Sequence, residues 1–306
     1  MEPENKFFHY KKDSGLTFRI VICFFALSVL YIIFLSVLAY LGVGFLPMIA
    51  IISLMILAQW YFSDKIVLWS SGAKVVTKEQ YPDLHRIVEK LVQRSNLPKP
   101  KVAVVNTNIP NAFATGKGHR SSLVAVTTGL LDILDEEEIE GVIGHELSHV
   151  KNRDVLVLTM ASLFSTIAWY LMQYGFYGSL YGGGYYSRSR GNSSGGGALI
   201  IILLVSVITW IVSFIITRAI SRYREFAADR GSAQITGRPM VLANALTKIS
   251  ESIKTTPRQQ TQKFQSLNAF FIIPAISGST IANLFATHPP LEQRIARLRE
   301  MQSSLV

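Results

Sequence analysis

Charged residues and cysteine are both scarce in this chain of 306 residues. Only 16% of the residues are charged, whereas 49% are apolar, and a typical soluble domain is about a quarter charged. Together with a mean hydropathy of +0.32, this excludes a disordered chain, a fibrous repeat and an ordinary soluble enzyme. The single cysteine, Cys23, excludes an internal disulfide framework and any cysteine-ligated metal site. Because Cys23 lies in an apolar run, we expect a buried thiol without a redox role.

The chain also lacks any nucleic-acid-binding motif, although its formal net charge is +10. The basic residues flank hydrophobic runs, so we expect membrane lipids as partners and no nucleic acid. Residues 175–197 hold 9 of the 21 glycines. No Gly-Lys-Ser/Thr and no preceding strand accompany them, which excludes a phosphate-binding loop and indicates a solvated connector.

Four long runs contain no charged residue. About 20 apolar residues in a helix cross the hydrocarbon core of a bilayer, so each run is long enough to span a membrane. The expected transmembrane helices form two hairpins, at residues 20–41 and 45–63, and at 155–174 and 198–217. For the second hairpin, a deeply buried or partly embedded pair would give the same pattern.

The distribution of charge predicts how these spans are oriented. If all four runs cross, the far side holds only Arg188 and Arg190, and the near side holds 28 of 30 basic residues. The positive-inside bias places the near side in the cytoplasm of a multi-pass cell-membrane protein. The chain then divides into an N-terminal hairpin segment, a cytoplasmic part, a second hairpin segment and a second cytoplasmic part, at residues 1–64, 65–154, 155–217 and 218–306.

The cytoplasmic parts have the pattern of a small mixed domain. Helical spacing covers Asp83–Ser95, and short β-branched runs at Lys101–Asn106 and Leu123–Thr128 indicate strands. Asp135 with Glu138 three residues later is a capping box that opens a further helix. The apolar run 269–276 is too short to span, and we expect it in a core or at an interface.

The helix opened by Asp135 carries the sequence H-E-x-x-H. His145 and His149 are four residues apart on one helical face, where two imidazoles can converge on one zinc ion. Glu146 lies 100° around the helix, beside the metal, where it can accept a proton from an attacking water. The alternative is a solvated face that happens to carry histidines. It is disfavoured because both histidines border an apolar face formed by Ile139, Val142, Ile143, Leu147 and Val150.

A catalytic zinc usually takes a third protein ligand. The candidates are carboxylates and the other histidines, His9, His85, His119 and His288. The chain returns to the same membrane face after the fourth run, which favours Glu225 as the ligand and Asp229 as a residue that orients a ligand histidine. The alternative is an exposed helix face whose two acids balance three arginines.

Four segments, in this order, resemble the HtpX family of membrane zinc proteases, which are related to the CAAX prenyl proteases. They are Pro110–Gly116, His145–His149, Glu225–Asp229 and His288–Arg294. The resemblance covers nearly the whole chain. It implies a gluzincin-like zinc protease domain within a mainly α-helical membrane protein, one Zn²⁺ per chain, and Glu225 as the third ligand.

The resemblance also implies a substrate site. Asn111, Ala112, Phe113 and Ala114 would form an edge strand that binds extended substrate backbone, the alternative being an ordinary hairpin loop. His288 would stabilise the tetrahedral oxyanion, the alternative being a residue at a helix entry.

The remaining candidates have weaker signals. We expect Arg294 to be structural. His9, His85 and His119 fit no motif, and we expect them at the surface.

The sequence therefore predicts a zinc endopeptidase acting at the cytoplasmic face. The family implies substrates that are misfolded or damaged membrane proteins, often under stress. One alternative is a prenyl-protein endoprotease, disfavoured because such relatives carry more membrane segments. Another is a non-catalytic scaffold or transporter with a structural metal, disfavoured because the spans carry no charge and Glu146 is present.

Overall fold

A computed structural model describes residues 13–41, 46–181, 195–256 and 288–305. The chain forms two compact units. We call Phe18–Trp60 with Val157–Ile220 the helical unit, and Met1–Thr17, Tyr61–Leu156 and Ser221–Val306 the mixed unit. Each is described by itself.

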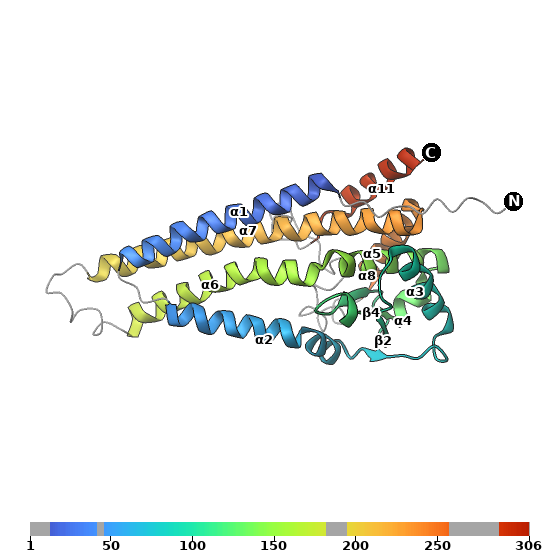
Figure 1. Cartoon of the computed structure of the whole chain (residues 1–306), viewed down its shortest axis with the longest axis horizontal. Coiled ribbons are helices and arrows are strands. Elements are labelled where there is room, and N and C mark those ends of the chain that lie inside the picture. Colours follow the sequence, from blue (N-terminus) through green and yellow to red (C-terminus); the bar gives the residue numbers. More distant parts are fainter. Residues whose placement is uncertain (1–12, 42–45, 182–194, 257–287, 306) are drawn as a thin grey trace. The chain divides into compact units, whose positions relative to one another are not determined.

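The helical unit contains parts of four long helices: α1 (Ser14–Tyr40), α2 (Leu46–Ser71), α6 (Asp154–Tyr181) and α7 (Gly195–Thr236) (Figure 1). Its core includes Tyr31, Phe34 and Leu38 packed with Ile167 and Leu171. The outward faces are apolar as well, since Phe25 and Ile32 are 69% and 66% exposed. Helices that are apolar all round are typical of a membrane environment.

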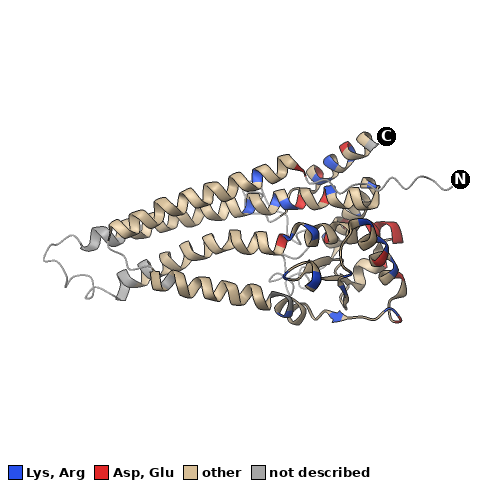
Figure 2. Cartoon of the chain, viewed as in Figure 1, with Lys and Arg blue, Asp and Glu red and all other residues tan. Residues whose placement is uncertain are grey.

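Charge is nearly absent from this unit. Among its described residues, only Arg19 and Arg218 are charged, and its helices are tan in Figure 2. Three helices are long and apolar enough to cross a membrane, at Ser14–Tyr40, Asp154–Gln173 and Ile200–Thr236. The fourth predicted span corresponds to α2, which bends by 64° between Ile49–Phe62 and Lys65–Ser71. If these two pieces form one span, the number of candidate transmembrane helices is four. The prediction of a mainly helical multi-pass protein is confirmed.

A polar stripe runs along the buried side of α7 within the apolar helical unit. Ser206, Thr209 and Ser213 are at most 3% exposed. The Thr217 hydroxyl donates to the Ser213 carbonyl at 2.8 Å, and its oxygen lies 3.3 Å from the Ser165 hydroxyl. The Thr217 hydroxyl is thus satisfied inside the unit, where no water competes for it.

The mixed unit is built on a four-stranded sheet. Its strands are β1 (Lys74–Val75), β2 (Lys101–Val105), β3 (Ala112–Thr115) and β4 (Leu123–Thr127), in the order β1-β2-β4-β3. β2 pairs with β4 in parallel, and β3 pairs with β4 antiparallel. The two strands expected from β-branched runs are confirmed. β3 lies at the edge of the sheet, so the loop alternative for this segment is wrong.

Helices complete the mixed unit: α3 (Pro82–Ser95), α4 (Thr128–Ile133), α5 (Glu136–Asn152), α8 (Pro239–Thr255) and α11 (Leu291–Leu305). The predicted capping box opens α5, because the Asp135 carboxylate accepts from the Glu138 amide at 2.9 Å and Glu138 accepts from the Asp135 amide at 3.1 Å. Val142, Ile143 and Leu147 of α5 are fully buried in the main core. The capping box thus opens a helix that is anchored at the centre of the unit.

Two glycines let α5 approach its neighbours closely. A Cβ atom on Gly141 would lie 3.1 Å from the backbone nitrogen of Leu242 in α8, and one on Gly144 would lie 3.1 Å from the Ser232 hydroxyl of α7. The Ser232 hydroxyl donates to the Gly141 carbonyl at 2.6 Å. α5 is therefore held tightly against both α7 and α8.

Two expectations about minor features were wrong. His85, expected at the surface, is buried at 7% exposure, and its Nε2 lies 3.1 Å from the Val76 carbonyl, because the β1 segment covers that face of α3. The connector expected at 175–197 is shorter, because α6 continues to Tyr181 and α7 begins at Gly195. His119 is half-buried. His9, residues 182–194 and the run 269–276 lie outside the described residues.

Candidate metal centre

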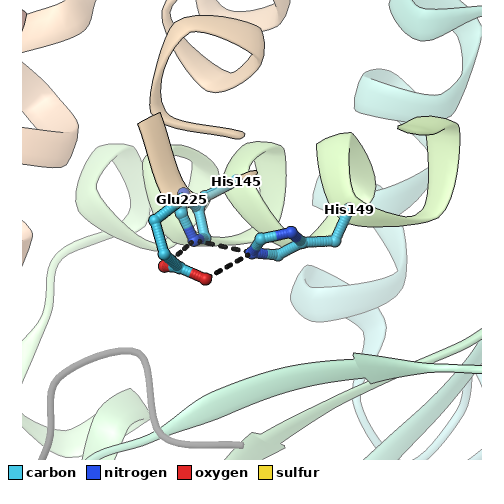
Figure 3. A group of neighbouring side chains, drawn as sticks. All are labelled: His145, His149 and Glu225. Carbon is cyan, nitrogen blue, oxygen red and sulfur yellow. Dashed lines mark hydrogen bonds and ion pairs between the residues drawn. The ribbon is translucent and has the colours of Figure 1, made fainter. Parts of the chain in front are cut away.

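Two helices of the mixed unit bring three candidate ligands together. His145 and His149 come from α5 and Glu225 from α7, and one donor atom of each lies within 4.8 Å of the others (Figure 3). The Nε2 atoms of the two histidines are 3.1 Å apart. Glu225 places Oε2 at 3.5 Å from Nε2 of His145, and Oε1 at 3.5 Å from Nε2 of His149.

These separations fit a zinc ion. Ligands at 2.0–2.1 Å around a tetrahedral zinc lie about 3.3–3.4 Å from one another. The two histidine nitrogens are 3.1 Å apart, and each lies 3.5 Å from one of the two oxygens of Glu225, so a small rotation of the carboxylate is enough to bring one oxygen to the metal. The donor set of two imidazoles and one carboxylate is one that catalytic zinc sites use, with a fourth position left for water. The residues present therefore fit a catalytic metal.

Asp229 holds the ring of His145. Its Oδ1 lies 3.0 Å from Nδ1 of His145. This contact favours a proton on Nδ1 and turns Nε2 toward the metal position. Arg294 of α11 fixes Asp229 with a two-pronged contact, Nε to Oδ2 at 2.9 Å and Nη2 to Oδ1 at 2.6 Å. The expectation that Arg294 is structural agrees with this contact.

The same carboxylates change the protonation of His145. Burial disfavours the charged ring, but Asp229 and Glu225 outweigh it and raise the pKa of His145 to about 9. In the metal-free centre the ring of His145 is therefore protonated on both nitrogens at neutral pH. A metal must displace the proton on Nε2.

Asp154 holds the second ligand, His149, a role that the sequence did not predict. Its Oδ2 lies 2.6 Å from Nδ1 of His149, and its Oδ1 lies 3.2 Å from Nε of Arg224. α5 ends at Asn152, the next residue Arg153 has a left-handed φ of 56°, and α6 begins at Asp154. That change of direction returns Asp154 toward His149. The only signal in the sequence is an aspartate five residues after the second histidine.

Glu146 is buried at 4% exposure between the two histidines of α5. Burial lowers the pKa of the Arg294 guanidinium, but the charges of Asp229, Glu225 and Glu146 outweigh this and raise it. Glu146 therefore lies close enough to Arg294 to belong to the same buried cluster as the candidate ligands.

The two predicted substrate-binding elements border this cluster. Nδ1 of His288 lies 3.0 Å from Oε2 of Glu225, and His288 is 7% exposed. β3 packs against α5, the helix that carries both ligand histidines. Asn111 uses its backbone to join β4, donating to the Thr127 hydroxyl at 2.8 Å and accepting from the Thr127 amide at 2.9 Å.

A multi-pass helical unit and an H-E-x-x-H helix facing a glutamate define a membrane metallopeptidase. Residues 78–302 match Peptidase family M48, and the chain belongs to that family. It is 47% identical to the Protease HtpX homolog 2 of Methanosarcina mazei over 296 residues, 97% of this chain and 98% of the relative. It is 48% identical to the Protease HtpX homolog of Moorella thermoacetica over 294 residues, 96% of each chain.

A solved structure shares the fold. The crystal structure of S. mikatae Ste24p has a TM-score of 0.55 and 18% sequence identity, covering 94% of this chain and 67% of that one. The expected HtpX resemblance and metalloprotease activity are confirmed by the family and these relatives.

Proposed function

We propose that this chain is a zinc endopeptidase that holds one Zn²⁺ through His145, His149 and Glu225. The observation that carries this proposal is the convergence of three donor atoms within 4.8 Å. When bound, zinc polarises a scissile carbonyl and lowers the pKa of a water molecule. Asp229 and Asp154 each orient one ligand histidine, which pre-forms the site.

Glu146 is the proposed general base and acid. It follows His145 directly on α5 and is buried within the cluster. It accepts a proton from the water that attacks the scissile carbonyl and returns that proton to the leaving amine. His288, held beside Glu225 at 3.0 Å, stabilises the negative charge on the tetrahedral intermediate.

The outer edge of β3 is the proposed binding site for the substrate backbone. Asn111, Ala112, Phe113 and Ala114 supply it, and among the described strands only β4 pairs with β3. An extended peptide added to this edge is recognised through main-chain hydrogen bonds. Recognition of that kind requires an unfolded segment and tolerates many sequences.

The proposed substrates are misfolded or damaged membrane proteins, cleaved at the cytoplasmic face. The excess of basic residues outside the spans supports this orientation of the mixed unit. Backbone recognition by β3 supports a preference for locally unfolded chains. The membrane lipids are the other expected partners.

The test uses purified full-length protein, wild type and Glu146→Gln, stripped with a chelator and supplied with zinc. We expect zinc-dependent cleavage of casein and self-cleavage by the wild type. The variant should bind zinc with similar affinity and lose at least about 100-fold in rate, because general-base removal typically costs that much. Binding of one zinc without any cleavage would support the scaffold alternative, and absence of zinc binding would overturn the proposal.

A further inference from the structure

A pocket opens beside the candidate metal centre, within the mixed unit. It is shallow, with a cavity volume of about 20 Å³, or about 310 Å³ when the adjoining space open to solvent is counted. Its walls come from the end of β3, the turn that follows, the end of α5 and the start of α6. They include Thr115, Lys117, His149, Arg153, Asp154 and Leu156.

The pocket is continuous with the reaction site. His149, a candidate metal ligand, forms part of its wall, and so do Ala114 and Thr115 of the edge strand. A peptide paired with β3 and cleaved at the metal centre therefore passes the mouth of the pocket. A candidate metal ligand, His149, is itself part of the pocket wall, and two residues of an extended strand span about 6.6 Å. We therefore place the side chain that enters the pocket within two residues of the scissile bond.

The charges that line the pocket are mostly positive. Nζ of Lys117 lies 3.8 Å above the ring of Tyr61, and Arg153 is exposed. Neither forms a salt bridge with a carboxylate in the described parts of the chain. The acidic residue of the wall, Asp154, is already paired with His149 and Arg224. The pocket is thus lined by two cations that have no carboxylate partner in the described parts of the chain, and by one acid that is already paired.

The turn at Gly116 fixes the position of Lys117. Gly116 has φ +132°, and a Cβ atom there would lie 2.5 Å from the Ser121 carbonyl oxygen. Only glycine fits this backbone conformation without strain. The turn therefore presents Lys117 to the pocket from a fixed backbone.

We propose that this pocket is a specificity subsite that binds an aspartate or glutamate side chain of the substrate, within two residues of the scissile bond. The inference rests on the proposed peptidase function and deepens it. Lys117 and Arg153 would supply the charge, and the apolar wall of Val150, Val155 and Leu156 would pack on the methylene groups.

The test uses zinc-loaded full-length protein in a non-ionic detergent without lipid. A library of peptides from a digested proteome is cleaved, and the cleavage sites are read by mass spectrometry. The pocket variants are Lys117→Gln with Arg153→Gln, and Lys117→Glu with Arg153→Glu. The matched control is Lys101→Glu with Arg120→Glu, which changes the charge equally at two exposed residues outside the pocket.

For the wild type and the control we expect acidic residues to be favoured over their amides about 2- to 5-fold at one position near the scissile bond, the range for a partly exposed ion pair. The glutamine variant should lose this preference, and the glutamate variant should favour lysine and arginine at the same position. Because each readout is a ratio within one sample, partial loss of folded protein does not affect it.

Three outcomes would overturn the inference. Cleavage by the wild type without any acidic preference overturns the inference alone. An acidic preference that is equal in the pocket variants and the control assigns the selectivity to another surface. Absence of all cleavage by zinc-loaded wild type overturns the proposed peptidase function, and the inference with it.

Discussion

At the scale of single residues, each ligand histidine is held by a carboxylate from another helix. Asp229 of α7 holds His145, and Asp154 of α6 holds His149. The sequence predicted the first of these, because Glu225 and Asp229 share a helix face. It did not predict the second, because the left-handed residue at the end of α5 is Arg153, with no glycine or proline to indicate a break.

Replacing Asp154 tests that second contact. We expect Asp154→Asn to weaken zinc binding about 10- to 100-fold, because the amide no longer fixes the ring and basicity of His149. Competition with a chelator of known affinity measures the change. The matched control is Asp132→Asn on α4, an exposed position. Equal zinc affinity in wild type and Asp154→Asn would show that the contact between Asp154 and His149 does not contribute to zinc binding.

The raised pKa of His145 predicts that zinc binding is linked to protons. Below about pH 9 the metal-free ring is protonated, so zinc must displace that proton. The apparent affinity should therefore rise as pH increases toward 9, by up to about tenfold per pH unit from this residue. Calorimetry at pH 7.5 in buffers of different ionisation enthalpy counts the protons released. Zinc binding without proton release would contradict the prediction.

At the scale of secondary-structure elements, the sequence predicted the longer helices and strands but not the shortest strands. α3, β2, β4 and the capping box of α5 follow from periodicity and local hydrogen bonding. β1 has two residues, too few for any period, and its position over His85 depends on contacts distant in sequence. The edge position of β3 followed from a family resemblance, since its own four residues have no distinctive alternation.

The close approach of α5 and α8 makes Gly141 a test of packing. We expect Gly141→Ala to destabilise the protein by about 1–2 kcal/mol, because the added carbon would lie 3.1–3.2 Å from backbone atoms of Leu242. This overpacking outweighs the better helix propensity of alanine. Thermal unfolding of the zinc-loaded protein measures it. Gly118→Ala is the control, since a Cβ atom there meets nothing within 4 Å. Equal stability of both variants would show that α8 shifts enough to accommodate the added carbon.

At the scale of the whole molecule, charge divides the chain into two kinds of surface. The described helical unit carries only Arg19 and Arg218, and the mixed unit carries the remaining described charges (Figure 2). Hydropathy made the spans predictable, since each run is long and free of charge. The bend of α2 was not predictable, because no proline marks the break between residues 62 and 65.

The proposed orientation can be tested with single cysteines in a Cys23→Ser background. We expect Lys78→Cys to react with a membrane-impermeant maleimide only after the cells are permeabilised. Ser187→Cys, in the segment expected on the outside, should react in intact cells. Both variants start from one cysteine-free chain, so expression is matched. Labelling of the cysteine at position 78 in intact cells would reverse the proposed topology.

The contact between Arg294 and Asp229 also has a consequence for biosynthesis. His145 and Arg294 are 149 positions apart in the chain, and both membrane helices α6 and α7 lie between them. A ribosome must therefore make α6 and α7 before it makes the guanidinium that fixes Asp229. The nascent chain cannot assemble the complete charge cluster until both helices have been synthesised.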